Sequence, residues 1–127
     1  MKVLVVGNGG REHALVWKLN KSKKIKKIYA APGNPGIAPF ASCVNILATD
    51  IPGLVRFAEE KKIDLTVVGP ETPLALGIVD DFTKRGLKIF GPNKNASRIE
   101  ADKSFAREFM HQYGIPSPKF QIYEVNM

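Results

Sequence analysis

The sequence of 127 residues contains a single cysteine and no apolar run of 18 residues. Cys43 has no partner for an intrachain disulfide, which is typical of proteins in a reducing compartment. The lack of a long apolar run argues against a transmembrane helix, and the N-terminus leads directly into a strand-like run rather than a signal peptide. We therefore expect a cytoplasmic protein without a membrane partner.

Acidic residues are scarce in the first 49 residues, which hold eight Lys or Arg and one acid, Glu12. The rest of the chain holds eleven residues of each sign, so the net charge of +7 lies entirely in the first part. Six lysines fall in residues 18–27. A nucleic-acid surface is one interpretation, and a solvated helix end with its turn is the other. No aromatic residue is interleaved among these lysines for base stacking, so we expect no nucleic-acid partner.

Short apolar runs alternate with amphipathic segments along most of the chain. The runs predict strands at residues 3–6, 25–31, 43–47, 65–68 and 87–90. The segments between them predict helices at residues 11–20, after the N-cap candidate Asp50, and at 73–84. This alternation predicts an α/β fold, a parallel sheet with helices on both faces, over residues 1–92. Residues 93–127 form a second unit, with a helix in one or two pieces at 96–113 and a lone strand at 120–123.

Glycine or proline follows four of the predicted strands, at residues 7, 32–33, 69–70 and 91–92. In an open parallel sheet the ligand crevice lies outside the carboxyl ends of the strands. Glycine lets backbone N–H groups approach a ligand, and a helix N-terminus favours an anion. We therefore expect these loops to line one electropositive hollow.

The first loop does not match a dinucleotide turn. The fingerprint G-x-G-x-x-G needs a third glycine where this chain has Glu12. An acid that would hold ribose hydroxyls is also missing after the second predicted strand, since none occurs before Asp50. We therefore do not expect NAD to bind.

A smaller phosphate ester fits the first loop better. Gly9 and Gly10 offer N–H groups at a helix start, and Arg11 adds a planar cation suited to phosphate. Glu12 and His13 are candidates for hydrogen bonds to sugar hydroxyls or to an amine. A plain strand-to-helix corner with surface charges remains the alternative.

The third loop places Glu71 between two prolines, Pro70 and Pro73. Proline on both sides stiffens the loop and fixes the direction of the carboxylate. Such a carboxylate suits a sugar diol or an ammonium group. It also suits the N-cap of the next helix, a role that Thr72 would fill equally well.

Four motifs in order carry a resemblance to a known family: GNGGREHAL at 7–15, APGNPG at 31–36, VGPETPLALG at 68–77 and IFGPNKNASRIEADKSFAREFM at 89–110. Together they resemble the start of the glycinamide ribonucleotide synthetase (phosphoribosylamine–glycine ligase) family of ATP-grasp enzymes. The likeness runs from Met1 to about Tyr123. It implies that residues 1–92 form a Rossmann-like, pre-ATP-grasp domain and that 93–127 begin an ATP-grasp module.

The resemblance also implies substrate-binding residues, in three loops. Those that match the family's phosphoribosylamine side are Gly9, Gly10, Arg11, Glu12, His13, Gly33, Asn34, Pro70 and Glu71. Lys103 matches the lysine that reaches ATP phosphates. No catalytic residue and no metal ligand is implied within this chain.

The implied reaction joins glycine to 5-phosphoribosylamine, with ATP converted to ADP and phosphate and with magnesium bridging the phosphates. The family's full enzyme is much longer, so we expect a fragment that binds the phosphoribosyl substrate weakly and is not catalytic alone. Apolar surface left by the missing part would favour self-association. The alternative is a stand-alone nucleotide-binding module.

Overall fold

The computed structural model describes residues 1–124, so the last three residues of the predicted second unit lie outside the described part. Its centre is one five-stranded, all-parallel sheet in the order β3-β2-β1-β4-β5. The strands are β1 Lys2–Gly7, β2 Lys27–Pro32, β3 Ser42–Cys43, β4 Leu65–Val68 and β5 Ile89–Phe90. The predicted α/β fold with a parallel sheet is confirmed.

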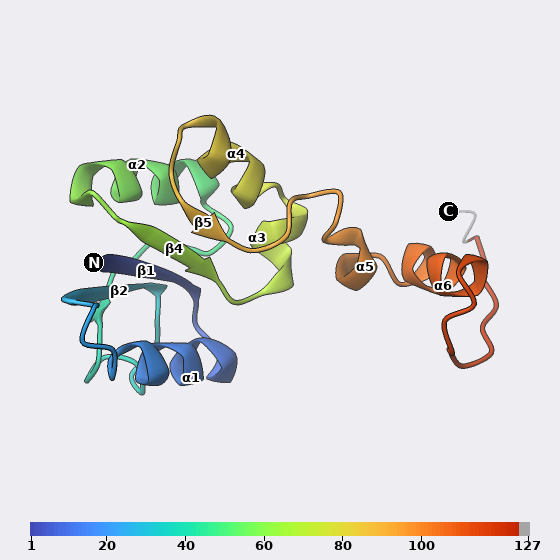
Figure 1. The fold of residues 1–127 in the computed structure, drawn as a ribbon, viewed down its shortest axis with the longest axis horizontal. Helices are drawn as coiled ribbons and strands as arrows, with labels where there is room; N and C mark the ends of the chain where they lie inside the picture. Colours follow the sequence, from blue (N-terminus) through green and yellow to red (C-terminus); the bar gives the residue numbers. More distant parts are fainter. Residues whose placement is uncertain (125–127) are drawn as a thin grey trace.

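Helices cover both faces of the sheet (Figure 1). Helix α1 (Gly10–Leu19) lies on one face, whereas α2 (Ile51–Lys61) and α4 (Ile78–Lys84) lie on the other. The short α3 (Glu71–Ala75) follows β4. Helices α5 (Arg98–Ala101) and α6 (Lys103–Gln112) extend away from the sheet as an arm. No helix among the described residues is long and apolar enough to cross a membrane.

Alternate residues of β1 enter two separate apolar layers, as expected for a central strand that is buried on both faces. Val3 and Val5 lie in the layer that includes Val16 of α1. Leu4 and Val6 lie in the layer formed largely by α2 and α4. The sheet is therefore held from both sides, which fixes the positions of the loops at its carboxyl edge.

Asp50 is the N-cap of α2, as the sequence predicts. Its carboxylate Oδ1 accepts a hydrogen bond from the backbone N–H of Gly53 at 3.0 Å, and Pro52 stands in the first turn of the helix. The cap satisfies one of the free N–H groups at the helix start.

The single helix predicted at residues 73–84 is wrong. The segment forms α3 and α4, separated at Gly77, which has a φ of +94° in the left-handed region. A helix cannot continue through that conformation, and the apolar periodicity of the segment conceals the break.

The C-terminal part differs from its prediction at one strand. The helical stretch at 96–113 is in two pieces, because Asp102 is extended and its Oδ1 caps α6 by accepting from Phe105 N–H at 3.0 Å. Residues 120–123 are not a strand, since no described strand lies beside them to share backbone hydrogen bonds. Exposed apolar side chains do gather on the arm, among them Tyr113 and Phe120. The expected self-association stays a prediction.

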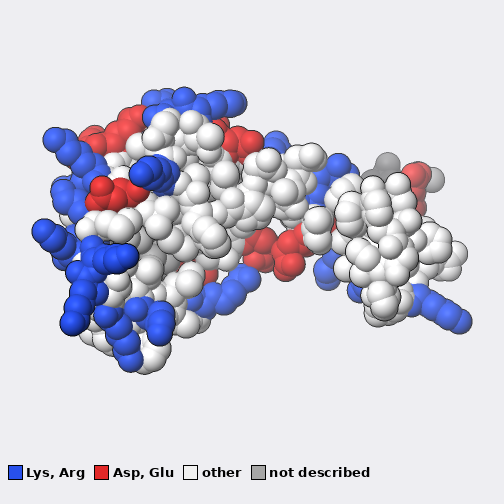
Figure 2. Space-filling model, in the orientation of Figure 1, with Lys and Arg blue, Asp and Glu red and all other residues white. Residues whose placement is uncertain are grey.

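The lysines of residues 18–27 occupy the end of α1 and the turn into β2, the solvated position that the second interpretation of the charge predicts. Figure 2 shows basic side chains spread over this end of the molecule. The ammonium of Lys21 lies 3.5 Å from the ring centroid of Trp17, the residue just before the run. That contact covers one aromatic ring with an intramolecular cation.

Phe82 and Phe90 test the two-layer packing as a matched pair. Phe82 is completely buried, so Phe82→Ala should lower the free energy of unfolding by about 3–5 kcal/mol. Phe90 is 70% exposed, and Phe90→Ala should change that free energy by less than about 0.5 kcal/mol. Urea unfolding followed by circular dichroism measures both. Equal effects would contradict the placement of α4 against the sheet.

Candidate functional site

Three loops meet at the carboxyl edge of the sheet. The backbone N–H of Gly33, after β2, donates to the carbonyl of Gly7, the last residue of β1, at 3.1 Å. The amide Nδ2 of Asn34 donates to the carbonyl of Asn8 at 2.8 Å. The third loop, after β4, joins them through Glu71. The structure therefore brings the three substrate-side loops of the sequence prediction to one edge.

The first turn of α1 is closed by its own glutamate. The Gly9 N–H donates to Glu12 Oε2 at 2.6 Å, while the His13 N–H donates to the Gly9 carbonyl at 3.0 Å. Gly9 is the N-cap and has no side chain, so the Glu12 carboxylate supplies the cap from within the helix. The Gly9 N–H is thus used internally, and the N–H groups of Gly10 and Arg11 remain at the helix start for an anion.

Glu12 is buried, at 3% exposure, so it is not one of the surface charges of the alternative interpretation. Its second oxygen, Oε1, is buried and has no hydrogen-bond partner. A Cβ at Gly69 would overlap this oxygen, and a Cβ at Gly7 would lie 2.6 Å from Glu12 Cγ. Glycine after β1 and after β4 therefore makes room for Glu12.

Gly7 and Gly69 belong to the site, although the sequence interpretation did not list them among its binding residues. The signal was present, because each follows a buried strand directly. Their role became visible only when the side chain that fills the space next to them was placed.

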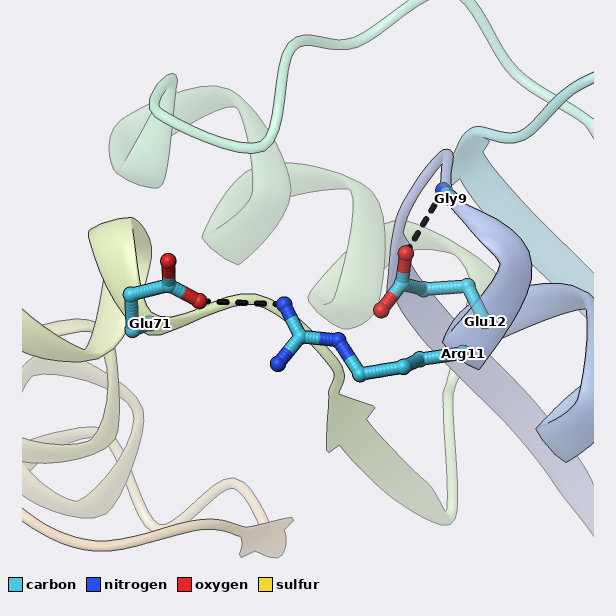
Figure 3. A network of polar contacts seen from close by, with 4 residues as sticks. All are labelled: Gly9, Arg11, Glu12 and Glu71. Atoms are coloured by element: carbon cyan, nitrogen blue, oxygen red, sulfur yellow. Dashed lines mark hydrogen bonds and ion pairs between the residues drawn. The ribbon is translucent and has the colours of Figure 1, made fainter. Parts of the chain in front are cut away.

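Arg11 and Glu71 form an ion pair between the first and third loops, with Arg11 Nη2 3.0 Å from Glu71 Oε2 (Figure 3). Arg11 lies in the first turn of α1 and Glu71 is the first residue of α3. Glu71 does not act as the N-cap of α3, which is Pro70, and Thr72 makes no cap bond either. The carboxylate instead joins two loops that are 60 residues apart.

Electrostatics at this edge are mixed rather than purely positive. The pKa of Glu71 lies below its ordinary value, first because of a hydrogen bond from its own backbone N–H and then because of Arg11. The pKa of Arg11 is raised by the hydrogen bond and charge of Glu71, and further by the charges of Glu12 and Glu100. Carboxylates on three elements therefore raise the pKa of one guanidinium, so the edge around Arg11 carries charges of both signs.

The second loop is held by its own polar groups. Asn34 Oδ1 accepts from the Ile37 N–H at 2.9 Å, so both ends of the Asn34 amide are engaged within the protein. Gly33 has a φ of +72°, which favours glycine. The His13 ring is half-buried and faces this loop, 6.2 Å from the Phe40 ring between centroids. Asn34 and His13 thus position the second loop against the first.

A hollow of about 460 Å³ lies beside Arg11. Its floor is mainly apolar, and Arg11 and Lys18 supply its two cations; the full lining is Arg11, Ala14, Leu15, Lys18, Val68 and Gly69. The first and third loops share this hollow. Asn34 and the second loop do not line it, so the expectation of one cavity shared by all the loops is wrong in that respect.

Lys103, the residue matched to ATP binding, is the exposed first residue of α6 on the arm, apart from the three loops. Among residues 1–124, no group of three or more His, Cys, Asp or Glu side chains could hold a metal ion. The described residues therefore do not fit a magnesium site by themselves.

An open parallel sheet with a glycine-lined, ion-paired crevice at its carboxyl edge defines a doubly wound α/β domain of the kind that holds ligands at that edge. A family model described as "Phosphoribosylglycinamide synthetase, N domain" matches residues 1–100. The chain belongs to this family.

Two curated relatives agree with that assignment. Phosphoribosylamine–glycine ligase from Caldanaerobacter subterraneus subsp. tengcongensis is 56% identical over 124 residues, which are 98% of this chain and 30% of the relative. The enzyme of the same name from Haemophilus influenzae is 51% identical over 123 residues, 95% of this chain and 29% of the relative. The chain thus spans about 30% of the length of the curated relatives that it matches.

Two solved structures share the fold. Phosphoribosylamine–glycine ligase from Thermotoga maritima superposes with a TM-score of 0.65 at 24% identity, covering 95% of this chain and 27% of that one. N5-carboxyaminoimidazole ribonucleotide synthetase from the same organism gives 0.70 at 20% identity, covering 93% of this chain and 32% of that one.

Gly69→Ala should test the packing of the buried carboxylate. The new Cβ would overlap Glu12 Oε1, so we expect a loss of about 1–3 kcal/mol in the free energy of unfolding. The loss should shrink in a Glu12→Ala background, because the overlapped group is then absent. Gly10→Ala is the control, since a Cβ there meets nothing within 4 Å. An undiminished loss in the Glu12→Ala background would contradict this packing.

The pH dependence of the ion pair has a definite sign. Because the pKa of Glu71 is lowered in the folded protein, its stabilising contribution is complete above the ordinary glutamate value of about 4.3 and is lost as the pH falls through the lowered value. In Arg11→Ala the pKa of Glu71 should rise but stay below the ordinary value, since the bond from its own N–H remains. NMR titration of the side-chain carboxyl measures this. An unchanged pKa would show that the pair does not form in solution.

Proposed function

We propose that this chain is the substrate-holding N-terminal part of a phosphoribosylamine–glycine ligase, which joins glycine to 5-phosphoribosylamine and converts ATP to ADP and phosphate in purine synthesis. The observation that carries the proposal is the N-terminus of α1, with Arg11 beside it, at the point where the three loops meet. A phosphate ester suits that combination of backbone N–H groups and a guanidinium. The relatives named above carry this activity in their names.

The proposed roles follow the geometry. The phosphate lies against the N–H groups of Gly10 and Arg11 and against the guanidinium. Glu71 is the carboxylate for the hydroxyls or the amine of the sugar, next to Pro70. Glu12 fills the space beside Gly69 and so shapes the site without facing the ligand. Its buried Oε1 would accept a hydrogen bond only from a ligand group that reaches Gly69.

The second loop and the cap have a positioning role in this proposal. Gly9, His13, Gly33 and Asn34 hold the loops together through the bonds and packing described above. Precise placement of this kind is what an enzyme contributes when it presents an amine to an activated carboxylate.

ATP and magnesium are proposed to bind away from the three loops that hold the phosphoribosyl substrate. Lys103, exposed on the arm, is the proposed contact to ATP phosphates, and residues 1–124 contain no group of three or more His, Cys, Asp or Glu side chains that could hold the metal. We therefore propose that the described residues bind the phosphoribosyl substrate but do not complete the reaction alone. The apolar side chains of the arm are the proposed surface for self-association or for the rest of a ligase.

Reconstitution tests the proposal. The chain is mixed with the C-terminal portion of the Caldanaerobacter ligase, a portion first shown to be active with its own N-terminal segment. We expect release of ADP that needs both glycine and phosphoribosylamine, and none from the chain alone. Arg11→Ala should lower kcat/KM by about tenfold to a hundredfold, since a charged hydrogen bond to phosphate is lost.

Arg85→Ala is the control, because Arg85 is also an exposed, ion-paired arginine but lies near α2, away from the crevice. Its activity should match that of the unmodified chain. Absence of ADP release with a competent C-terminal portion would contradict the proposed function.

A further inference from the structure

The Arg11–Glu71 pair occupies the guanidinium that the proposed function assigns to phosphate. In Figure 3 the Arg11 side chain reaches from α1 to Glu71 at the start of α3, while the Glu12 carboxylate turns back to Gly9. An arriving phosphate would therefore meet Glu71 already on its partner. The two anions would then compete for the charge of one guanidinium and repel each other.

Breaking the Arg11–Glu71 ion pair requires little free energy. The Arg11 and Glu71 side chains are 65% and 47% exposed, and exposed ion pairs contribute little to stability. A phosphate dianion carries more charge than a carboxylate and can bind the planar guanidinium through two parallel hydrogen bonds. The start of α1 adds further attraction for an anion at the same place. Phosphate therefore has the advantage over Glu71 in the competition for Arg11.

Glu71 can bind another partner once Arg11 has left it. Its carboxylate stands at the start of α3 and retains the hydrogen bond from its own backbone N–H. It then lies beside a bound phosphate as an acceptor without a cation. A ligand that brings hydroxyl or ammonium donors along with its phosphate gives that carboxylate new partners, whereas a simple anion leaves it to water.

We propose that Glu71 is a displaceable counter-ion of Arg11 that sets ligand specificity: phosphate takes the guanidinium, and the released carboxylate then binds hydroxyl or ammonium donors of the same molecule. This inference rests on the proposed function and deepens it. A simple anion loses binding free energy by breaking the ion pair and makes no contact with the released carboxylate. A sugar phosphate regains that free energy when its hydroxyl or ammonium donors bind the carboxylate.

The test compares inorganic phosphate with ribose 5-phosphate, whose binding to the chain is followed by NMR. In Glu71→Gln the competing charge is gone, so inorganic phosphate should bind about two- to fivefold more tightly. Ribose 5-phosphate should bind no more tightly, because it loses a charged acceptor for its hydroxyls. The preference for ribose 5-phosphate over phosphate should therefore fall by roughly that same factor or more.

Glu59→Gln is the matched control. Glu59 pairs with Arg85 at 3.3 Å, with side-chain exposures of 43% and 59%, and this pair lies apart from the three loops. Neither affinity should change in Glu59→Gln. Arg11→Ala should lose binding of both anions. In the unmodified chain, saturating phosphate should raise the pKa of the Glu71 carboxyl toward its ordinary value as Arg11 leaves it.

Weaker or unchanged phosphate binding in Glu71→Gln overturns the exchange, as does a Glu71 pKa that phosphate does not move, or an absence of phosphate binding to the unmodified chain. The proposed function fails separately. If the exchange is overturned while reconstitution still gives glycine-dependent ADP release, the function stands without it. If the exchange is observed and reconstitution fails, Glu71 controls an anion site and the proposed ligase function is lost.

Discussion

The loops at the carboxyl edge are organised around the buried carboxylate of Glu12. One oxygen closes the first turn of α1 through Gly9, and the other lies against Gly69, where a side chain has no space. Because the same residue touches the ends of two neighbouring strands, it fixes the distance between the first and third loops. The crevice is therefore shaped before a ligand arrives, which lowers the entropic cost of binding.

The burial of Glu12 next to Arg11 also contributes to the mixed charge of the site. Burial of Glu12 places a negative charge behind Arg11, with Glu71 in front and Glu100 near enough to raise the pKa of Arg11 further. A purely cationic cradle would bind any phosphate. A guanidinium among carboxylates favours a molecule with an anion at one point and hydrogen-bond donors at another, and phosphoribosylamine has both.

Local features of the fold could be predicted from the sequence, whereas features that depend on distant contacts could not. The buried strands and the Asp50 cap depend on residues that are adjacent in the sequence, and the structure confirms them. The break at Gly77 was missed because the apolar spacing on its two sides suits one continuous helix. The lone strand at 120–123 was wrong because apolar alternation cannot supply a neighbouring strand.

The site likewise has features that the sequence predicts and features that it does not. The motif order located the three loops, but the bond from Asn34 to Asn8 spans 26 residues and the Arg11–Glu71 pair spans 60. Local residue spacing does not predict contacts between residues so far apart in the sequence. Glu12 is the instructive case, since its position in place of a third glycine argued against a dinucleotide, yet its burial could not be seen. A charged residue set among glycines at a strand end can be the packing partner of those glycines rather than a ligand-facing group.

The placement of Lys103 bears on how the proposed reaction is organised. Arg11 is fixed by a sheet that is packed on both faces, whereas Lys103 begins a helix of the arm, beyond the extended residue Asp102. A ligase of this type must hold two phosphorylated molecules, and like charges repel when they are held close together. Cations on separate structural elements let each phosphate be neutralised where it lies. In the proposed function, the sugar phosphate therefore lies against the packed sheet, and the ATP phosphates lie against the arm.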